Sequence, residues 1–366
     1  MSEHVSDYLF AGSVRLRIRG SRRVLRHFDA EYGEAAAIPG TCLRDGGQSP
    51  TADLQPDVEV RIRPGLLARP GSGGALVVGG HKSARWRVAL APPDAVPLRA
   101  TIALAGGPPS FALSLVQGYF VEALVAVALA RTGRVALPSA AFASGNGGTV
   151  LLGRSGAGKT TLTARALAAG RTVLSDDQVI IDGAGGARRY PRRLRFYPDI
   201  QQTAPDAWSR LTPGTRAALL RRHTVRRLTR GFVAPSLAVP VSELGTTVAA
   251  QAVPVRQLVV VDRSGTGELT VTPRDAAWVV EQAGLVLADQ RARLSAQVSG
   301  PWAAVLDSAL AAERRTVAAA FRNVPAVEVA VPRAWGAQRS IDALDVLLGL
   351  TSGRATLPAV GPPARA

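Results

Sequence analysis

One run of the sequence carries glycines and a lysine at the spacing that holds a polyphosphate. This glycine-rich loop consists of Gly153, Arg154, Ser155, Gly156, Ala157, Gly158, Lys159 and Thr160, with Thr161 next in the chain. Its glycines let successive backbone N–H groups turn inward around phosphate oxygens. Lys159 would bridge the β- and γ-phosphates of a nucleotide such as ATP, and the Thr160 hydroxyl would bind Mg²⁺. The residues expected to contact the nucleotide are Gly153, Ser155, Gly156, Ala157, Gly158, Lys159, Thr160 and Thr161.

The predicted elements around the loop suit this chemistry. A strand at Thr149–Leu152 enters it, and a helix at Lys159–Ala169 leaves it and ends at Gly170. The helix N-terminus adds a partial positive charge beside the phosphates. Glycine-rich turns between a strand and a helix also occur without nucleotide. The lysine favours a nucleotide here, because Lys82 is the only other lysine and a compact ammonium fits where a guanidinium fork does not.

Two adjacent acids, Asp176 and Asp177, follow a predicted strand at Thr172–Leu174. One carboxylate can accept a proton from an attacking hydroxyl while the other holds Mg²⁺, usually through water. Mg²⁺ and Lys159 are expected to lower the pKa values of both acids and to offset their repulsion. The alternative is an Asp-Asp turn that ends a strand. The position of the pair, seventeen residues after Lys159, favours the chemical role.

These features together resemble the catalytic domain of HPr kinase/phosphorylase and its HPr-kinase-like relatives. That family carries a G-x-S-G-x-G-K-[ST] loop, a short helix that ends in glycine, and a strand that leads to an Asp-Asp pair. The resemblance covers residues 135–181 closely, continues more weakly to about 350, and is absent before 110. It implies a P-loop nucleotide-binding core of the phosphoenolpyruvate carboxykinase type. It also implies that Asp176 is the general base and that Asp177 assists Mg²⁺.

Two departures from the family pattern bear on the reaction. The family usually has a phosphate-contacting histidine on the strand before the loop, where this chain has Pro138 or Ser139. A downstream glutamate-bearing segment, needed for phosphate removal, is also missing. Both departures favour a one-way kinase over a bifunctional enzyme. The missing histidine leaves open a nucleotide-binding scaffold without activity. The acceptor also stays open between a protein or peptide serine and a small molecule.

A segment rich in arginine follows the paired acids. Between Arg188 and Arg230 there are twelve arginines, and Asp199 and Asp206 are the only acids. One interpretation is a basic flap that clamps phosphate or an acidic substrate, with Arg193 or Arg195 as the cation that stabilises the transition state. The other is a solvated helix face at residues 217–230. Few aromatic residues lie among the arginines, so nucleic-acid binding is not favoured.

The patterning predicts two domains and a tail. Within residues 1–110, apolar and polar residues alternate in short runs such as Val58–Arg63. This pattern predicts an antiparallel β-rich domain for substrate recognition or oligomerisation. Residues 111–350 alternate between strands and helices, which predicts an α/β catalytic domain. Residues 351–366 are predicted to be a disordered tail. Further strands are predicted at Val135–Ala143, Gln178–Asp182, Gln257–Asp262, Leu269–Thr272 and Val327–Val331, and further helices at Leu113–Arg131, Pro273–Ala283, Ala304–Ala319 and Ile341–Leu348.

Composition and targeting features indicate a cytoplasmic, reduced, globular protein. The 366 residues carry a net charge of +17 and a single cysteine, Cys42, so a disulfide scaffold is excluded. The N-terminal residues lack the basic and apolar regions of a secretory signal. The stretch Phe111–Ala130 is long enough to span a bilayer, but Glu122 favours a buried helix of a soluble protein with this residue at its edge. The family resemblance also favours a homo-oligomer.

The leading hypothesis is an ATP-dependent, Mg²⁺-requiring kinase that acts on a hydroxyl group. The alternative is a nucleotide-dependent switch or ATPase that drives a partner protein. The loop locally resembles that of ABC ATPases, but the chain lacks a Leu-Ser-Gly-Gly-Gln-like signature. Asp262 follows an apolar strand as a Walker B acid would. Its neighbours Arg263, Ser264 and Gly265 instead indicate a turn.

Overall fold

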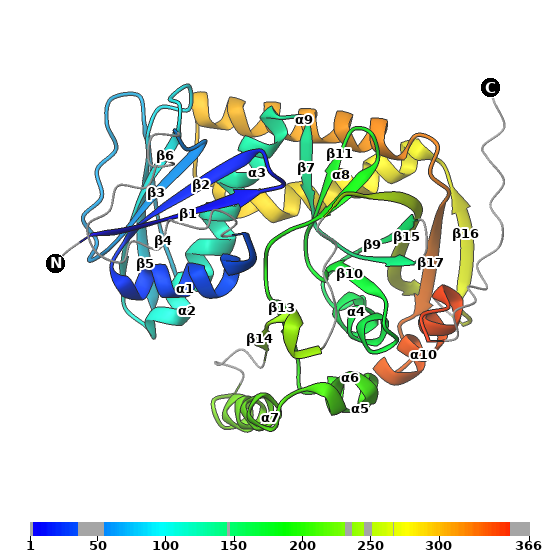
Figure 1. Cartoon of the computed structure of the whole chain (residues 1–366). Helices are drawn as coiled ribbons and strands as arrows, with labels where there is room; N and C mark the ends of the chain where they lie inside the picture. The colour runs from blue at the N-terminus through cyan, green and yellow to red at the C-terminus, as the bar shows by residue number, and fades with distance from the viewer. Residues whose placement is uncertain are drawn as a thin grey trace. The chain divides into compact units, whose positions relative to one another are not determined.

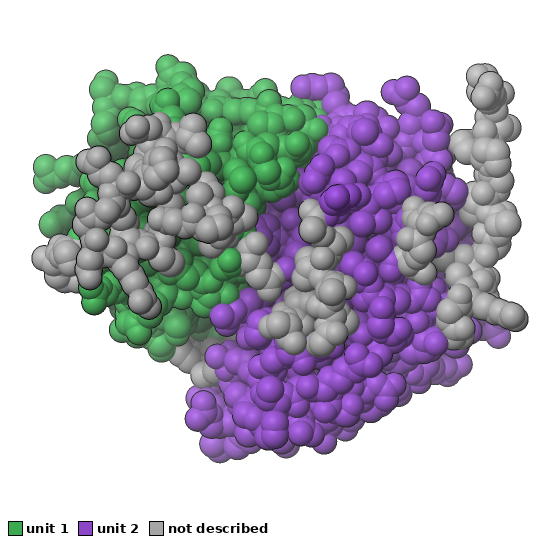
Figure 2. Space-filling view, in the orientation of Figure 1, with its two compact units in different colours: residues 1–135, 287–313 green, residues 136–286, 314–366 purple. Residues whose placement is uncertain are grey.

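The computed structural model describes residues 3–35, 55–144, 147–230, 236–244, 251–265 and 267–351, so Cys42 and the predicted tail beyond 351 lie outside the described residues. The chain forms two compact units (Figure 2). Unit 1 contains Met1–Val135 and Leu287–Glu313, and unit 2 contains Ala136–Val286 and Arg314–Ala366. This division differs from the predicted boundary near residue 110. The later segment belongs to unit 1 through contacts such as that of Trp302 Nε1, which donates to Ala91 O at 2.8 Å.

Unit 1 is built on a six-stranded sheet in the order β1-β2-β3-β6-β5-β4 (Figure 1). The sheet is antiparallel in β1–β2, β4–β5 and β5–β6, as predicted, whereas β3 runs parallel to both β2 and β6. Alternate residues of these strands are buried, which is the physical basis of the period-two pattern. The strands are β1 (His4–Phe10), β2 (Val14–Gly20), β3 (Val58–Pro64), β4 (Ala75–His81), β5 (Ala84–Leu90) and β6 (Leu98–Ala105).

Helix α1 (Arg22–Tyr32), which lies between β2 and β3 in the chain, was not among the predicted elements. Parallel neighbours require a crossover connection, so this helix accounts for the parallel pairing of β2 with β3. Val24, Leu25, Phe28 and Tyr32 are its buried apolar residues, at the spacing of one helix face. That spacing was visible in the sequence. A 3₁₀ turn, η1 (Gly33–Ala35), follows the helix.

The apolar stretch of unit 1 forms one continuous helical segment. It comprises α2 (Pro109–Val116), a π-helical turn η2 (Gln117–Val121) and α3 (Glu122–Arg131). Pro109–Arg131 is long and apolar enough to cross a membrane, but 78% of its most apolar window is buried inside the protein. Glu122 was expected at the edge of the helix and is instead only 2% exposed. It is tolerated there because its Oε1 accepts hydrogen bonds from Tyr32 and Gln117.

Unit 2 contains most of a nine-stranded mixed sheet with the order β10-β8-β9-β15-β12-β11-β7; β17 pairs with β15, and β16 with β17. Three neighbours, β9, β15 and β17, run parallel, so their C-terminal ends meet at one edge. The predicted strand at 135–143 is divided at Pro138 into β7 and β8. The strands are β7 (Arg134–Leu137), β8 (Ser139–Ser144), β9 (Gly147–Gly153), β10 (Thr172–Ser175), β11 (Val179–Asp182), β12 (Gly186–Arg189), β15 (Val253–Gly265), β16 (Thr270–Arg274) and β17 (Ala326–Pro332).

Helix α4 packs on β8 and β10. Helix α10 packs on α4 (Figure 1). Helix α4 ends as predicted at Gly170, where the N–H groups of Gly170 and Arg171 donate to Leu167 O and Ala166 O, a Schellman cap. A small sheet pairs β13 (Leu194–Phe196) with β14 (Leu237–Val239). The helices and the 3₁₀ turn are α4 (Lys159–Ala168), α5 (Ile200–Thr203), α6 (Pro205–Arg210), α7 (Pro213–Leu228), η3 (Val241–Leu244), α8 (Ala276–Ser295), α9 (Pro301–Phe321) and α10 (Ala337–Leu348).

Candidate functional site

The glycine-rich loop leaves the end of β9 and enters α4, as the sequence predicted. Gly156 and Gly158 have φ angles of +85° and +90°, in the left-handed region that favours glycine. A Cβ on Gly153 would lie 2.7 Å from Val261 O of the neighbouring strand β15, so this position also requires glycine. A Cβ on Gly156 would meet no atom within 4 Å, so open space borders the loop there. The loop path therefore depends on its glycines.

Lys159 folds back onto the loop that precedes it. Its Nζ donates hydrogen bonds to Gly153 O at 2.5 Å and to Arg154 O at 3.1 Å. Burial lowers the pKa of Lys159, and the charges of Asp177 and Asp176 oppose that shift. The ammonium group is thus close enough to both carboxylates to interact with them electrostatically. This is the placement expected of a cation that binds phosphate inside the loop.

The paired acids lie beside the helix that follows the loop. Asp176 is 3% exposed. Its Oδ2 accepts a long hydrogen bond of 3.4 Å from Thr160 Oγ1 and one of 3.1 Å from the backbone N–H of Arg195 in β13. Ser175 shapes the turn, because its Oγ accepts from the N–H groups of Asp177 and Gln178. The structure therefore brings together Lys159, Thr160 and the two acids that the sequence singled out.

The pKa of Asp176 is raised to about 6 by its surroundings in the protein, whereas the lowering expected from the sequence was that caused by bound Mg²⁺ together with Lys159. Burial is the largest cause, and the neighbouring charge of Asp177 is the second. The hydrogen bond from Arg195 N and the charge of Arg192 act in the opposite direction and only partly compensate. Asp176 is therefore a carboxylate that ionises close to neutral pH.

Asp177 pairs with an arginine that the sequence analysis did not choose. Arg192 Nη1 lies 2.8 Å from Asp177 Oδ2, and the arginine side chain is 12% exposed against 50% for the aspartate. Arg195 reaches the acids through its backbone N–H. Arg193 makes no hydrogen bond or ion pair with any residue that the structure describes. The sequence showed a cluster of arginines, but only the fold determines which of them faces the acids.

The rest of the arginine segment divides between the two interpretations. Helix α7 is solvated along its length, with Leu219 as its buried residue, as the second interpretation predicted. Its Arg222 interacts electrostatically with Arg195, so the helix lies near β13, whose Arg195 N–H contacts Asp176. Thr212 caps the helix by accepting a hydrogen bond from Thr215 N at 3.2 Å.

The remaining predicted contact residues line the same turn. Ser155 is exposed, Thr161 is half-buried, and Ala157 is buried, with its N–H bonded to Arg154 O at 3.2 Å. At the place of the family histidine, Ser139 is fully buried and lies opposite Leu152 in the sheet. Its hydroxyl donates to Leu137 O at 3.1 Å. Asp262 continues strand β15, where the sequence analysis had expected a turn.

The donor set suits Mg²⁺ that is held mainly by a nucleotide. Thr160, Asp176 and Asp177 offer oxygen atoms, which Mg²⁺ prefers, and Mg²⁺ commonly takes one or two carboxylates together with phosphates and water. Among the residues that the structure describes, no group of three or more histidine, cysteine or carboxylate side chains is arranged to hold a metal alone. The open space at Gly156 leaves room for phosphate oxygens. The residues therefore fit a Mg²⁺–nucleotide complex.

Comparison with known proteins adds no family to these observations. No protein-family model matches the chain, and no curated protein is significantly similar to it.

Proposed function

We propose that the chain is an ATP-dependent, Mg²⁺-requiring kinase that transfers the γ-phosphoryl group to a hydroxyl of a protein, a peptide or a small molecule. The contact between Thr160 and Asp176 carries this proposal, because it joins the phosphate-binding loop to a buried carboxylate. A core of the HPr-kinase and phosphoenolpyruvate carboxykinase type, and a cytoplasmic location where ATP is available, belong to the same proposal.

Each residue has a distinct role in the proposed reaction. Lys159 and the loop N–H groups bind the phosphates, and Thr160 and Asp177 provide oxygen ligands for Mg²⁺. Mg²⁺, when bound, neutralises charge on the β- and γ-phosphate oxygens. Asp176 accepts the proton of the acceptor hydroxyl as its oxygen bonds to the γ-phosphorus. The bond from the γ-phosphorus to the bridging oxygen breaks, and ADP leaves.

The electrostatics of Asp176 support its role as a general base. A base works best when its pKa lies near the working pH, because it is then ionised and still binds a proton well. With a pKa of about 6, Asp176 is mostly ionised at pH 7 and is more basic than an ordinary aspartate. Arg192 Nη1 donates to Asp177 Oδ2 at 2.8 Å. This contact fixes the Asp177 carboxylate and compensates part of its negative charge beside the proposed Mg²⁺ site.

Transfer of a labelled phosphoryl group tests the proposal. The full chain is incubated with γ-labelled ATP, Mg²⁺ and pools of peptides, proteins and small hydroxyl compounds, and the wild type is compared with Asp176→Asn. The proposal predicts acceptor-dependent transfer that the substitution abolishes. Acceptor-independent hydrolysis that survives the substitution would instead support a nucleotide-driven switch.

A further inference from the structure

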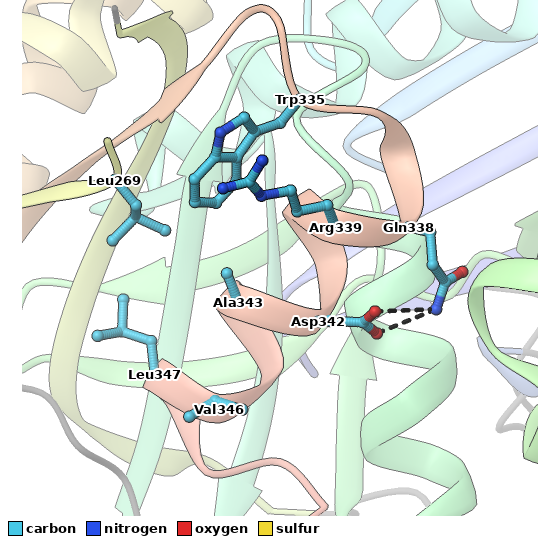
Figure 3. Close-up of a pocket in the computed structure, with 8 residues that line it drawn as sticks. All are labelled: Leu269, Trp335, Gln338, Arg339, Asp342, Ala343, Val346 and Leu347. Carbon is cyan, nitrogen blue, oxygen red and sulfur yellow. Dashed lines mark hydrogen bonds between the residues drawn. The ribbon is translucent and has the colours of Figure 1, made fainter. Parts of the chain in front are cut away.

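An open pocket lies on unit 2 along helix α10 (Figure 3). Its volume is about 780 Å³. Leu269, Trp335 and Leu347 form apolar parts of its lining, and Gln338, Arg339 and Asp342 provide polar groups. In Figure 3 the Arg339 guanidinium lies over the Trp335 ring, 4.0 Å from its centroid. The pocket thus combines a large aromatic face with hydrogen-bonding groups.

The segment that carries Trp335, a lining residue of the pocket, leaves the sheet at the edge where the glycine-rich loop begins. Val261 of β15 pairs with Gly153, and further along Gly265 pairs with Pro332 of β17, three residues before Trp335. Arg263 fixes the segment after β17, because its Nη2 donates to Trp335 O at 2.8 Å. The loop and the segment that carries Trp335 therefore follow parallel strands at the same edge.

Helix α10 also packs directly against the loop and its helix. A Cβ on Gly158 would lie 2.5 Å from Ile341 Cδ1, so the first turns of α10 touch the N-terminus of α4. Asp342, which lines the pocket, pairs with Arg165 of α4 at 2.6 Å. The helix that lines the pocket therefore also borders the glycine-rich loop.

We infer that the pocket takes the adenine base of the nucleotide whose phosphates occupy the loop, with Trp335 as its stacking platform. This inference rests on the proposed function and names a second part of the same nucleotide site. The base stacks on the indole, and Arg339 covers the outer face of the base as it now covers the ring. The amino group of adenine donates to the Gln338 amide oxygen or to the Asp342 carboxylate, which are acceptors at the pocket rim.

The number and kind of polar groups agree with a base rather than with another phosphate. Asp342 already carries a negative charge, and its oxygens accept from Gln338 Nε2 at 3.0 and 3.2 Å. A second phosphate would meet this carboxylate as well as the Arg339 guanidinium, whereas a base can use both groups, by hydrogen bonding to the first and by stacking on the second. Stacking of a base on an aromatic side chain changes binding by about tenfold or more.

Calorimetric titration in the presence of Mg²⁺ separates the base from the phosphates. ATP and inorganic tripolyphosphate are titrated into the wild type and into Trp335→Ala. We expect Trp335→Ala to weaken ATP binding about tenfold and to leave tripolyphosphate binding unchanged. Trp335→Phe, which keeps an aromatic face, is expected to restore most of the affinity for ATP.

A matched control exists elsewhere in unit 2. Trp278 also lies under an arginine, Arg274, at 4.9 Å. Trp278→Ala is expected to change neither titration. The inference is overturned if Trp335→Ala leaves ATP binding unchanged or weakens both ligands equally. If the wild type binds neither ligand, or if Lys159→Ala binds both normally, the proposed function fails and the inference fails with it.

Discussion

Thr160 Oγ1 lies 3.4 Å from Asp176 Oδ2, although the two residues belong to different elements. Thr160 is the second residue of α4, and Asp176 is in the turn after β10. Their contact places a hydroxyl suited to Mg²⁺ beside a carboxylate suited to accept a proton.

Replacement of Asp176 by Asn is expected to stabilise the protein without nucleotide. The pKa of Asp176 is about 6 when folded against the usual 3.8, so the folded state retains a proton that the unfolded state releases. The free energy of unfolding therefore falls as the pH rises from about 4 to about 6 and stays lower above that range. Ionisation of the buried Asp176 lowers the free energy of unfolding by at most about 3 kcal/mol at pH 7. Urea unfolding of the wild type and of Asp176→Asn at pH 4 and pH 7.5 measures this loss of stability.

Asp177→Asn is the control for this stability prediction. Asp177 is half-exposed and paired with Arg192, so its removal offers no relief from burial. We expect it to leave stability unchanged or to lower it slightly. Equal stabilisation by both substitutions at pH 7.5 would contradict the account of the Asp176 pKa.

Removal of Arg192 is expected to shift the pH dependence of phosphoryl transfer. The charge of Arg192 lowers the pKa of Asp176, so Arg192→Ala leaves that pKa above about 6. As the pH is lowered, the rate of transfer by Arg192→Ala therefore begins to fall at a higher pH than that of the wild type, because Asp176 becomes protonated at a higher pH. A pH–rate profile with the acceptor found in the labelling screen measures the shift. Arg193→Ala, one residue along the chain, is expected to leave the profile in place.

Lys159→Ala is expected to abolish nucleotide binding. The side chain supplies the one ammonium group inside the glycine-rich loop, where it lies 2.5 Å from Gly153 O. Lys82→Ala removes the only other lysine of the chain, which is exposed in unit 1, and serves as the control. Calorimetry with ATP and Mg²⁺ is expected to show binding by Lys82→Ala alone. If Lys159→Ala binds ATP as tightly as the wild type, the proposal that Lys159 binds the phosphates is wrong.

Alanine at two glycines of the loop separates folding from binding. Gly156 and Gly158 both have positive φ, which costs about 1–2 kcal/mol with any other L-residue. Gly158→Ala also drives a Cβ against Ile341, whereas Gly156→Ala enters open space. We expect both to weaken ATP binding and Gly158→Ala to lower the melting temperature more. Gly170→Ala, with positive φ and open space outside the loop, controls for backbone strain.

The sequence predicted the elements that carry the site because their signals are local. The glycine spacing, the helix that ends at Gly170 and the two acids after a short strand all lie within about thirty residues of the chain. Period-two and helical patterns likewise predicted β17 to within one residue at each end, and they predicted the central part of β15 and the C-terminal part of α10, both of which extend further. These elements bury one continuous face, which a periodic pattern records.

The features that the sequence did not predict depend on contacts between distant residues. Strand β13 exists because Arg195 pairs with Ala238, some forty residues away, and the arginine that meets Asp177 is determined by where this small sheet forms. The parallel pairing of β3 depends on the crossover after β2. The raised pKa of Asp176 follows from burial that only the folded chain produces. The pairing of β13, the contact of Arg192 and the burial of Asp176 leave no pattern within a short window of sequence, whereas the helical spacing of α1 does.

A crystal structure of the chain with Mg²⁺ and a non-hydrolysable ATP analogue tests the central claim most directly. The account predicts the triphosphate inside residues 153–160, with Lys159 on its β- and γ-phosphates and Asp176 beside the γ-phosphorus. A triphosphate bound outside this loop, or a γ-phosphate turned away from Asp176, would contradict it.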